Sequence, residues 1–591
     1  MSIYPYQKIP TTHIRLMRLV RGPPPSSDQD HDTSDILSYE LVSFPLESCP
    51  SYMALSYTWG ADNPDQIISI DGHNTPIQNN LHAFLRRHSN SNSLPPYASG
   101  IDETLLWVDA ICINQLDKHE KSLQLTLMGE IYKRASHIGL WLGEDSHDSG
   151  VAIDCWLRLV DKVRQGELIE PTDLSLRETK SLDNLALRKY WHRVWVWQEA
   201  STPNTPSYIL CGDKQIALED AFAVNDAIRT MMLNRYRVTK LIPWVPKLQA
   251  MYELARIRSS HTGKENSSNG PPLGGTADWN SLMSMLFATR GLQATDPRDK
   301  IYALFPIYRD IRGLLPFRVC DGKAVEESYR DACTFILQRE QDLRLFLLCN
   351  ASSVPASSQS WIPNFTHLVQ PFEIFRSQGL FDASGSKPPH VSVVDNRRLV
   401  KVRGVRVDPI DTTHLGLTYP NEQESSFDIE YWQPRFQVWF QSIAKFISKG
   451  EGDRNYHRYI QLSEAADQLL SLGLCPGLKL RRTGSVSHWP VFDVAAGADP
   501  PNIEEVRSEF VDLFLRLGHA SLFWTAHGYL GLGDMCVRSG DIVVVLYGLS
   551  IPIVLRRAAL FWRIVGPCFV VGMMDGEALK LRAWEEEFTI F

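Results

Sequence analysis

One segment, Leu106 to Gly143, constrains the fold of this chain more than any other. It reads LWVDAICINQLDKHEKSLQLTLMGEIYKRASHIGLWLG, in which two apolar runs flank an amphipathic stretch. Apolar residues recur at helical spacing from Lys118 to Ser136, and the preceding run LLWVDAICI is typical of a strand buried on both faces of a parallel sheet. The order strand, helix, strand predicts a parallel-type sheet with polar residues at the strand end, where α/β proteins bind ligands.

Length and composition predict a folded protein of several domains. The chain has 591 residues, of which 44% are hydrophobic and 22% are charged, and this is more apolar material than one core usually organises. The formal net charge of -8 argues against the basic surface of a nucleic-acid-binding protein. We therefore expect no nucleic-acid partner.

The apolar runs and the cysteines indicate where the protein resides. The N-terminal sequence MSIYPYQKIPTTHIRLMRLV lacks the apolar core of a signal peptide, and the apolar runs near the C-terminus are interrupted by Arg, Gly and Pro. The ten cysteines include no CxxC pair, which is typical of reduced core thiols and not of structural zinc. We expect a cytoplasmic protein with no membrane span, no metal and no cofactor.

Periodicity predicts an N-terminal α/β domain over residues 1–230. Strands are expected at His13 to Leu19 and in the segments SYMALSYTWG, QIISIDG and YILCG, and a helix is expected at Leu81 to His88. The polar, proline-rich stretch from Arg21 to Asp35 is expected to be a hairpin loop.

The rest of the chain divides into a mainly helical region, residues 231–350, and a β-rich region, residues 351–591. Helical periodicity at Trp279 to Arg290 and at Ala324 to Arg339 follows a Ser-, Gly- and Pro-rich connection. Short alternating segments beyond them, such as HVSVVDNRRLVKVRGVRV and GDIVVVLYGLSIPIVLRR, predict strands. Two predicted helices interrupt these strands, Trp432 to Ser448 and Ile503 to Leu517.

Polar residues near the ends of two predicted strands are candidate ligand contacts. Asp109 lies within the apolar run LLWVDAICI, and Asn114 comes at its C-terminal end, where open sheets bind ligands. Ser56, Tyr57 and Gly60 end the strand in LSYTWG, where a glycine permits close approach of a ligand. The structural alternative is that Asp109 and Asn114 bind loop backbone and that the LSYTWG segment forms a plain turn.

A single helix is predicted from Leu185 to Ala200. Trp195 and Glu199 are one helical turn apart and share a face, so that a carboxylate lies beside indole surface. Partial desolvation there raises the pKa of a carboxyl group. The structural alternative makes Glu199 a surface group or the partner of Arg188 or Arg193, and makes the tryptophans core residues.

Four blocks of sequence stand in a distinctive order. They are YMALSYTWG, the segment from Leu106 to Gly143, YWHRVWVWQEA and ATDPRDKIYALFPI. In this order and spacing they resemble the fungal heterokaryon-incompatibility (HET) domain family, and SWIPNF with GYLGLGDMCVRSGDIVVVLYGLSIPIVLRR resembles the tail of that family. The resemblance implies fungal allorecognition, an innate immunity role in which the HET domain triggers programmed cell death. It also implies a protein partner, leaves a homo-oligomer open, and names no reaction.

A second resemblance, to the TIR domain, bears on chemistry. There the first strand ends in a Ser-Tyr pair, and a later helix carries a W-x-x-x-E pattern, here Trp195 and Glu199. In enzymatic TIR domains that Glu catalyses NAD cleavage, so the resemblance implies an NAD hydrolase with Glu199 as catalytic residue and NAD as substrate. The stretch before the W-x-x-x-E helix is longer than in a TIR domain. The residues expected to contact NAD are Ser56, Tyr57, Trp59, Gly60, Asp109, Asn114 and Trp195.

Two functions of different classes stay open at this point. The first is an NAD-consuming death effector formed by residues 1–230, with the remainder restraining or sensing. The alternative is a non-enzymatic signalling or assembly module that recruits a death effector, in which Glu199 is an interface or structural residue. A scaffold whose β-rich region binds an antagonistic partner is compatible with either.

Other motifs are interpreted as structural. In TDPRDKIYAL, Asp296 is expected to be a helix N-cap and Pro297 the first helical residue. Cys112 is interpreted as an inert core thiol and not as a nucleophile activated by His119. The sequence contains neither a P-loop nor a dinucleotide-binding fingerprint.

Overall fold

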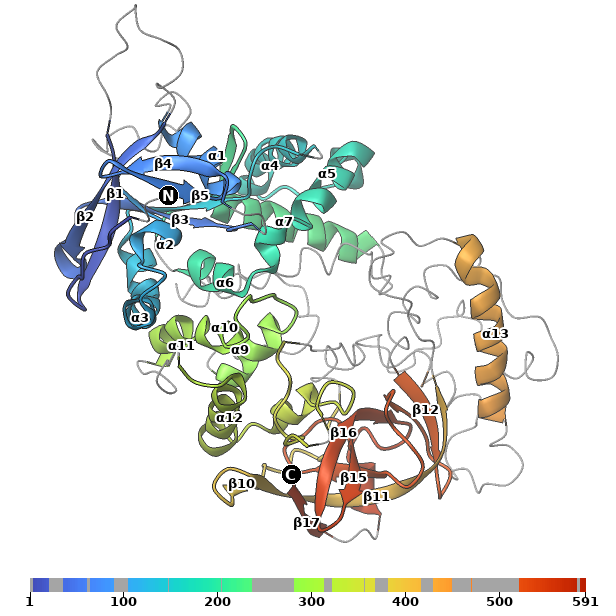
Figure 1. The fold of residues 1–591 in the computed structure, drawn as a ribbon. Helices are drawn as coiled ribbons and strands as arrows, with labels where there is room; N and C mark the ends of the chain where they lie inside the picture. The colour runs from blue at the N-terminus through green and yellow to red at the C-terminus, as the bar shows by residue number, and fades with distance from the viewer. Residues whose placement is uncertain are drawn as a thin grey trace, which may run out of the picture. The chain divides into compact units, whose positions relative to one another are not determined.

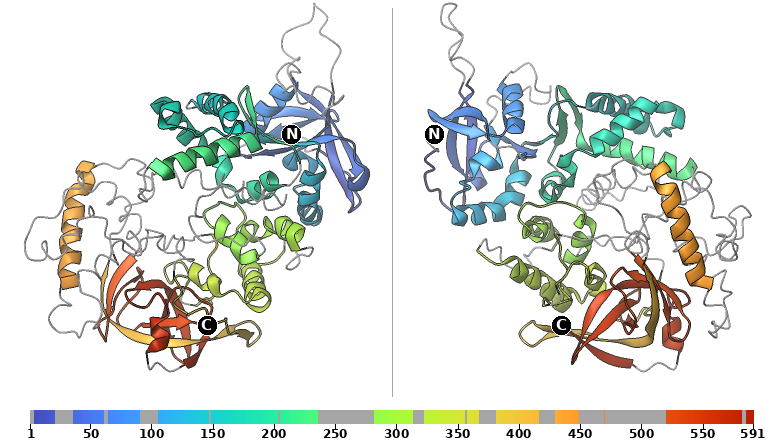
Figure 2. Two further views of the ribbon diagram at one scale, coloured as in Figure 1. Left: turned by 180° about the vertical axis from the view of Figure 1, so that it is seen from behind. Right: turned by 45° about the vertical axis from the view of Figure 1, so that its right-hand side comes forward.

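The computed structural model divides the chain into two compact units (Figures 1 and 2). Unit 1 comprises Met1–Arg235, Ile242–Ser268 and Gly291–Lys323, and unit 2 comprises Tyr236–Leu241, Asn269–Arg290 and Ala324–Phe591. Residues 291–323, which the sequence assigns to a helical middle region, thus join the N-terminal unit. The structure describes residues 4–20, 36–60, 64–89, 105–146, 148–202, 205–235, 281–312, 322–355, 357–366, 381–415, 429–448, 469, 520–581 and 585–591. The predicted loop Arg21 to Asp35, the Ser-, Gly- and Pro-rich connection and the predicted helix Ile503 to Leu517 lie outside these residues.

The described part of unit 1 is built on a mixed sheet in the order β5-β4-β2-β1-β6-β3-β7-β8-β9 (Figure 1). The central strands β6, β3, β7 and β8 run parallel, as the sequence predicts, but β1, β2, β5 and β9 each make antiparallel pairs. The sheet is therefore mixed and not parallel throughout. Its strands are β1 (His13–Leu19), β2 (Ser38–Pro45), β3 (Tyr52–Tyr57), β4 (Gln66–Ile70), β5 (His73–Ile77), β6 (Leu105–Trp107), β7 (His137–Trp141), β8 (Ser207–Cys211) and β9 (Lys214–Ala217).

Helices cover both faces of this sheet. Figure 1 shows α1 and α4 on one side of the sheet and α3 and α6 on the other. Trp141 on β7 packs against Phe84, with ring centroids 5.8 Å apart, and Trp107 on β6 packs against Tyr132 at 5.5 Å. The α-helices are α1 (Asn79–Ser89), α2 (Asp109–Cys112), α3 (Lys118–Arg134), α4 (Ser149–Arg164), α5 (Leu176–Ala186), α6 (Val194–Ser201), α7 (Leu218–Arg235), α10 (Asp299–Tyr302) and α11 (Phe305–Arg312); the 3-10 helices are η1 (Leu46–Ser48), η3 (Pro171–Asp173) and η4 (Lys189–His192).

Local signals explain where several of these elements begin and end. Strand β1 has the bounds that the sequence predicts, His13 to Leu19. Helix α3 begins after Asp117, whose side chain accepts hydrogen bonds from the backbone N–H groups of His119 and Glu120. The β4–β5 hairpin turns at Asp71 and Gly72, which both have positive φ, as predicted for this dipeptide.

Two predicted elements are wrong. The run LLWVDAICI is a strand only as far as Trp107; Val108 is the last extended residue, and Asp109 begins the short helix α2. The predicted helix Leu185 to Ala200 is three elements: α5 ends at Ala186, η4 begins after the non-helical Arg188, and extended backbone at Arg193 separates η4 from α6. Local periodicity fails here because Arg193 pairs with Gln293, a contact that no local pattern contains.

Unit 2 combines described helices with a sheet that closes on itself. Strands pair in the order β11-β12-β13-β16-β15-β14, and β14 pairs back to β11. A buried apolar cluster that includes Phe523, Val543 and Val565 fills the interior. The strands are β10 (Val391–Val394), β11 (Leu399–Leu415), β12 (Ala520–Thr525), β13 (Leu530–Asp534), β14 (Ile542–Leu546), β15 (Ile553–Ala558), β16 (Phe561–Val570) and β17 (Glu585–Ile590); the helices are α9 (Leu282–Thr289), α12 (Val325–Phe335), η5 (Ile336–Glu340), η6 (Leu343–Leu348), α13 (Ile429–Ser448) and α17 (Glu577–Lys580).

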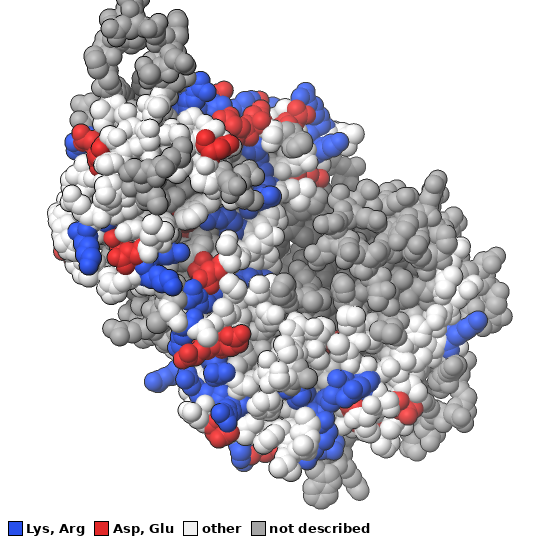
Figure 3. All heavy atoms as spheres, in the orientation of Figure 1, with Lys and Arg blue, Asp and Glu red and all other residues white. Residues whose placement is uncertain are grey.

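The described surface mixes charges of both signs. Figure 3 shows Lys and Arg side chains beside Asp and Glu side chains on the face that it draws. Exposed ion pairs such as Arg177 with Asp148 are screened by water and contribute little to stability. Among the described residues, every helix is too short or too polar to cross a membrane.

Candidate functional site

A buried hydroxyl at the end of β3 contacts a buried carboxyl on α6. Ser56 Oγ donates a hydrogen bond to Glu199 Oε2 and lies 2.7 Å from the Tyr190 hydroxyl. A serine hydroxyl has only one proton, and Ser56 uses it in the hydrogen bond to Glu199. The Tyr190 hydroxyl therefore donates to the Ser56 oxygen. Ser56, Tyr190 and Glu199 are 1%, 1% and 3% exposed. The central parallel strand and α6 therefore meet through a water-excluded chain of three polar groups.

Burial governs the titration of Glu199. Desolvation raises the pKa of its carboxyl from 4.5 to about 7, because charge is costly away from water, although Arg193 and the Ser56 hydroxyl lower it. The negative charge of Asp109 raises it further. A carboxyl with a pKa near 7 exchanges a proton at neutral pH, which is a property of acid–base groups at functional sites.

A second carboxyl lies at the start of α2. The indole N–H of Trp59 donates to both carboxylate oxygens of Asp109, at 2.9 and 3.1 Å, and the backbone N–H of Ala110 donates at 2.7 Å. Tyr57 forms a further hydrogen bond with Asp109. Desolvation raises the pKa of Asp109, while Arg193 lowers it. Asp109 thus links the β3 loop to the β6 end, which are the two strand ends that the sequence singles out.

Arg193 is the cation of this cluster. Its guanidinium donates to the backbone oxygen of Tyr57 and lowers the pKa of both Asp109 and Glu199. Arg188, the other arginine considered as a partner of Glu199, donates instead to the backbone oxygens of Leu142 and Glu144 at 2.7 Å. Glu199 is therefore neither a surface group nor the partner of Arg188.

The remaining predicted contacts divide into two groups. Gly60 has φ +88°, a turn conformation that favours glycine, and follows Trp59, whose side chain is 36% exposed. Asn114 accepts a hydrogen bond from the backbone N–H of Leu116 at 3.2 Å, which is the local arrangement of the structural alternative. Trp195 donates to Asp299 at 2.9 Å. The structure thus gathers Ser56, Tyr57, Trp59, Asp109 and Glu199, and gives Asn114 and Trp195 other partners.

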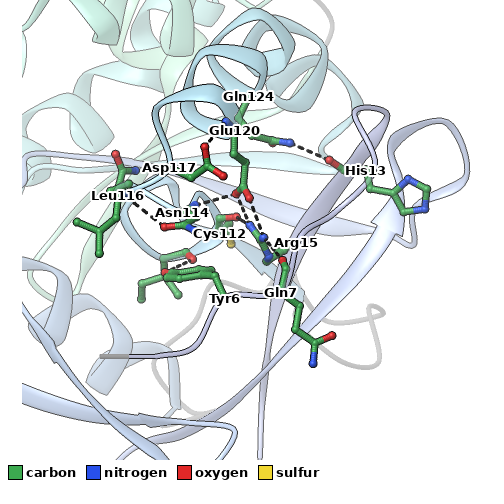
Figure 4. Close-up of polar contacts among 12 residues, drawn as sticks. Tyr6, Gln7, His13, Arg15, Cys112, Asn114, Leu116, Asp117, Glu120 and Gln124 are labelled. Carbon is green, nitrogen blue, oxygen red and sulfur yellow. Dashed lines mark hydrogen bonds and ion pairs between the residues drawn. The ribbon is translucent and has the colours of Figure 1, made fainter. Parts of the chain in front are cut away.

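A buried ion pair fixes the end of α2 and the loop that follows it (Figure 4). Arg15 on β1 donates to Glu120 on α3 at 2.5 and 3.0 Å, and to the backbone oxygen of Cys112 at 3.1 Å. Glu120 also accepts from the backbone N–H of Asn114 at 2.9 Å. Arg15, whose side chain is 4% exposed, belongs to no sequence motif. Only the tertiary structure therefore identifies the pair of Arg15 and Glu120.

The interpretation of Cys112 as a core residue fits its surroundings. The thiol is buried, and its sulfur accepts from the backbone N–H of Val108 at 3.3 Å. Burial raises the pKa of this thiol to about 12, far from the range of a reactive thiolate. Among the described residues, no group of three His, Cys, Asp or Glu side chains has the arrangement of a metal site.

Comparison with known proteins identifies two regions of the chain. Residues 52–199 match the family model described as Heterokaryon incompatibility protein (HET), and residues 504–591 match the Het-6 beta-barrel domain. Across 692 aligned positions, the chain is 23% identical to Heterokaryon incompatibility protein 6, OR allele, of Neurospora crassa, covering 98% of this chain and 96% of the relative. These matches support a heterokaryon-incompatibility family protein. No solved structure matches the chain.

The HET match covers the cluster at the end of β3. It begins at residue 52, where β3 begins, and it ends at Glu199 itself. Strand β1, which carries Arg15, and helix α10 lie outside the matched HET residues although both belong to unit 1. Unit 1 is therefore larger than the segment that matches the HET family model.

Proposed function

We propose that unit 1 hydrolyses NAD to nicotinamide and ADP-ribose with Glu199 as its catalytic residue, and that this reaction drives programmed cell death in allorecognition. One observation carries the proposal: the buried Glu199 carboxyl lies at the carboxyl end of the central parallel strand, bonded to Ser56. This edge is where ligands bind in open α/β sheets. The order of strands and helices resembles that of the TIR domain, and this resemblance supplies the reaction class.

The chemistry needs one carboxylate. Cleavage breaks the bond between the nicotinamide nitrogen and C1′ of the ribose, and the electron pair stays on the nitrogen, so nicotinamide leaves as a neutral base without a general acid. Positive charge then develops on the ribose, and an ionised Glu199 stabilises it. Water adds to C1′ and loses its proton, which gives ADP-ribose. Ordinary glycoside hydrolysis requires a second carboxyl as acid, which this leaving group does not.

The neighbouring residues fit roles around such a substrate. Trp59 is partly exposed, and its indole N–H is fixed by Asp109 at 2.9 Å, so its ring is a candidate surface for stacking a planar base. Arg193 offsets the charge of Asp109 and Glu199 and lowers the pKa of both carboxyls, which favours their ionised forms. Because Glu199 is only 3% exposed, NAD reaches it only after a conformational change opens the site.

The test is nicotinamide release by the purified full-length protein incubated with NAD. Glu199→Gln preserves the shape of the side chain and removes its charge, and we expect it to lower the rate by at least about 100-fold. Glu47→Gln is the matched control, because Glu47 is an exposed glutamate of the same unit. Equal rates for wild type and Glu199→Gln would show that Glu199 is not the catalytic residue.

The alternative is a non-enzymatic module that self-associates or recruits a death effector. One observation favours it: a fully buried Glu bonded to a buried Ser is also what a purely structural polar network contains. In that case NAD levels in cells expressing the protein stay constant during death, while substitutions of exposed residues far from Ser56 abolish toxicity. A fall in NAD that precedes cell death and requires Glu199 would support the enzyme over the non-enzymatic module.

The remaining proposals concern partners and regulation. The Neurospora crassa relative is a heterokaryon incompatibility protein, so we propose a protein partner in allorecognition, a homo-oligomer as the active form and a cytoplasmic location. We further propose that unit 2, with its closed sheet, restrains the activity of unit 1 or senses the partner. Co-purification from cells that carry the incompatible allele tests for the partner.

A further inference from the structure

The helix that carries Glu199 is too short to be stable alone. Helix α6 has eight residues, Val194–Ser201, and its N-cap residue Arg193 provides no side-chain cap. Isolated helices of this length are unstable in water, so contacts from elsewhere in the chain must fix its position. Both Arg193 and Glu199 depend on those contacts.

Backbone bonds from a distant segment cap this helix. The N–H of Val194 donates to the backbone oxygen of Gln293 at 2.9 Å, and the N–H of Gln293 donates to the oxygen of His192 at 2.5 Å. Arg193 and Gln293 form an isolated parallel bridge. One of the N–H groups that a helix N-terminus leaves without a partner is thus satisfied by residue 293.

A side-chain bond fixes the same helix one turn before Glu199. The indole N–H of Trp195 donates to Oδ2 of Asp299 at 2.9 Å, and Asp299 lies in the first turn of α10. Burial raises the pKa of Asp299 to about 6. Because Trp195 and Glu199 are one turn apart on α6, this bond fixes the rotation of the helix about its axis.

A buried cation joins the two attachment points. The ammonium group of Lys300 donates to the backbone oxygen of Leu292, the residue before Gln293. Lys300 is 6% exposed, and burial lowers its pKa to about 8. Leu292, Gln293, Asp299 and Lys300 are together called the α6 clamp.

We propose that the α6 clamp is a positioning element of the Glu199 site, with Asp299 as its principal positioning residue. It aligns Arg193 through the Gln293 bridge and Glu199 through Trp195, and it lies outside the residues 52–199 that match the HET family. The sequence explains the Asp-Pro-Arg-Asp-Lys motif as helix capping, but the N-cap of α10 is Arg298, and Asp296 accepts its backbone N–H in the preceding turn at 3.0 Å. Instead of capping α10, Asp299 and Lys300 hold α6 in place.

The experiment uses the full-length protein with Asp299→Ala, Asp299→Asn and Trp195→Phe, and Asp220→Ala as control. Asp220 pairs with Arg164 at 2.8 Å on another part of unit 1. Asp299→Asn keeps an oxygen acceptor for Trp195 and is expected to behave as wild type. For Asp299→Ala and Trp195→Phe, hydrogen exchange of the amides from Val194 to Ser201 should become about tenfold faster.

The kinetic arm rests on the proposed NAD hydrolysis, and the exchange arm does not. Misalignment of Glu199 should lower kcat for nicotinamide release by about 10- to 100-fold with little change in KM. Unchanged exchange in Asp299→Ala overturns the clamp, and faster exchange with unchanged kcat overturns its positioning role. If wild type releases no nicotinamide, the proposed function fails, and the exchange result alone decides whether the clamp holds α6.

Discussion

The hydroxyl of Ser56 donates a hydrogen bond to the carboxyl of Glu199 across a sequence separation of 143 residues. This bond joins the end of β3 to α6 and leaves an ionisable group in a water-excluded position. Such a group has an energetic cost at neutral pH, since its ionised form is desolvated. Perturbed pKa values of this kind are common at functional sites, which is one reason for proposing Glu199 as a functional group.

Replacing Glu199 by Gln should stabilise the protein above neutral pH. Burial raises the pKa of Glu199 from 4.5 to about 7, so the folded state binds a proton more tightly than the unfolded state. Below pH 4.5 the carboxyl is protonated in both states, and its contribution to stability is at its highest; that contribution is lost as pH rises through about 7. At pH 8 the neutral amide should therefore gain about 3 kcal/mol of unfolding free energy.

Thermal unfolding of full-length wild type and Glu199→Gln at pH 5 and pH 8 measures this gain. The difference in Tm should be several degrees at pH 8 and much smaller at pH 5. A destabilised Glu199→Gln at pH 8 would mean that the ionised carboxylate stabilises the fold, contrary to the burial argument.

Substituting Arg193 by Met should move the pH dependence of nicotinamide release. Arg193 lowers the pKa of Glu199 from the value that burial alone would impose. Without the guanidinium, the carboxylate forms only at higher pH, so the rise of activity with pH should shift upward by about one pH unit or more. Arg193→Lys keeps a positive charge and should shift the profile less. Identical pH profiles for wild type, Arg193→Met and Arg193→Lys would show that Arg193 does not act on Glu199.

Separating the Arg15–Glu120 pair should destabilise unit 1. Both side chains are almost fully buried, so Glu120→Ala leaves an uncompensated guanidinium, at a cost of about 3–5 kcal/mol. The double variant Arg15→Met with Glu120→Leu removes both charges and should recover much of that loss. Urea unfolding of wild type, Arg15→Met, Glu120→Leu and the double variant gives the coupling energy. Additive losses in the double variant would show that the pair does not act as a unit.

Gly404→Ala should disrupt unit 2 and spare unit 1. An added Cβ at Gly404 on β11 would lie 2.4 Å from the backbone oxygen of Val545 and 2.9 Å from Cα of Leu546. Backbone atoms cannot move aside cheaply, so we expect a loss of about 1–3 kcal/mol or more. Calorimetry should show one unfolding transition, that of unit 2, at a lower temperature than in wild type. Higher nicotinamide release in this variant would support restraint by unit 2, and lower toxicity would support a sensing role.

The sequence predicts most of the sheet but less of the site. The apolar runs of β3 and β7 and the periodicity of α3 are local signals, and the structure has these elements close to the predicted bounds. Strand ends and a motif resemblance single out Ser56, Asp109 and Glu199, which the structure places in one cluster and which stay a predicted site. The break at Arg193 depends on Gln293, and the buried pair of Arg15 and Glu120 joins β1 to α3, so neither is visible to a pattern read along the chain.

The discontinuity of unit 1 has a consequence for biosynthesis. The α6 clamp follows Glu199 by about 100 residues, and ribosomes add about 5–20 residues per second. A nascent chain therefore displays Glu199 for roughly 5–20 s before Asp299 exists to align it. On the proposed function, a nascent chain that still lacks Asp299 should release nicotinamide more slowly than the complete protein.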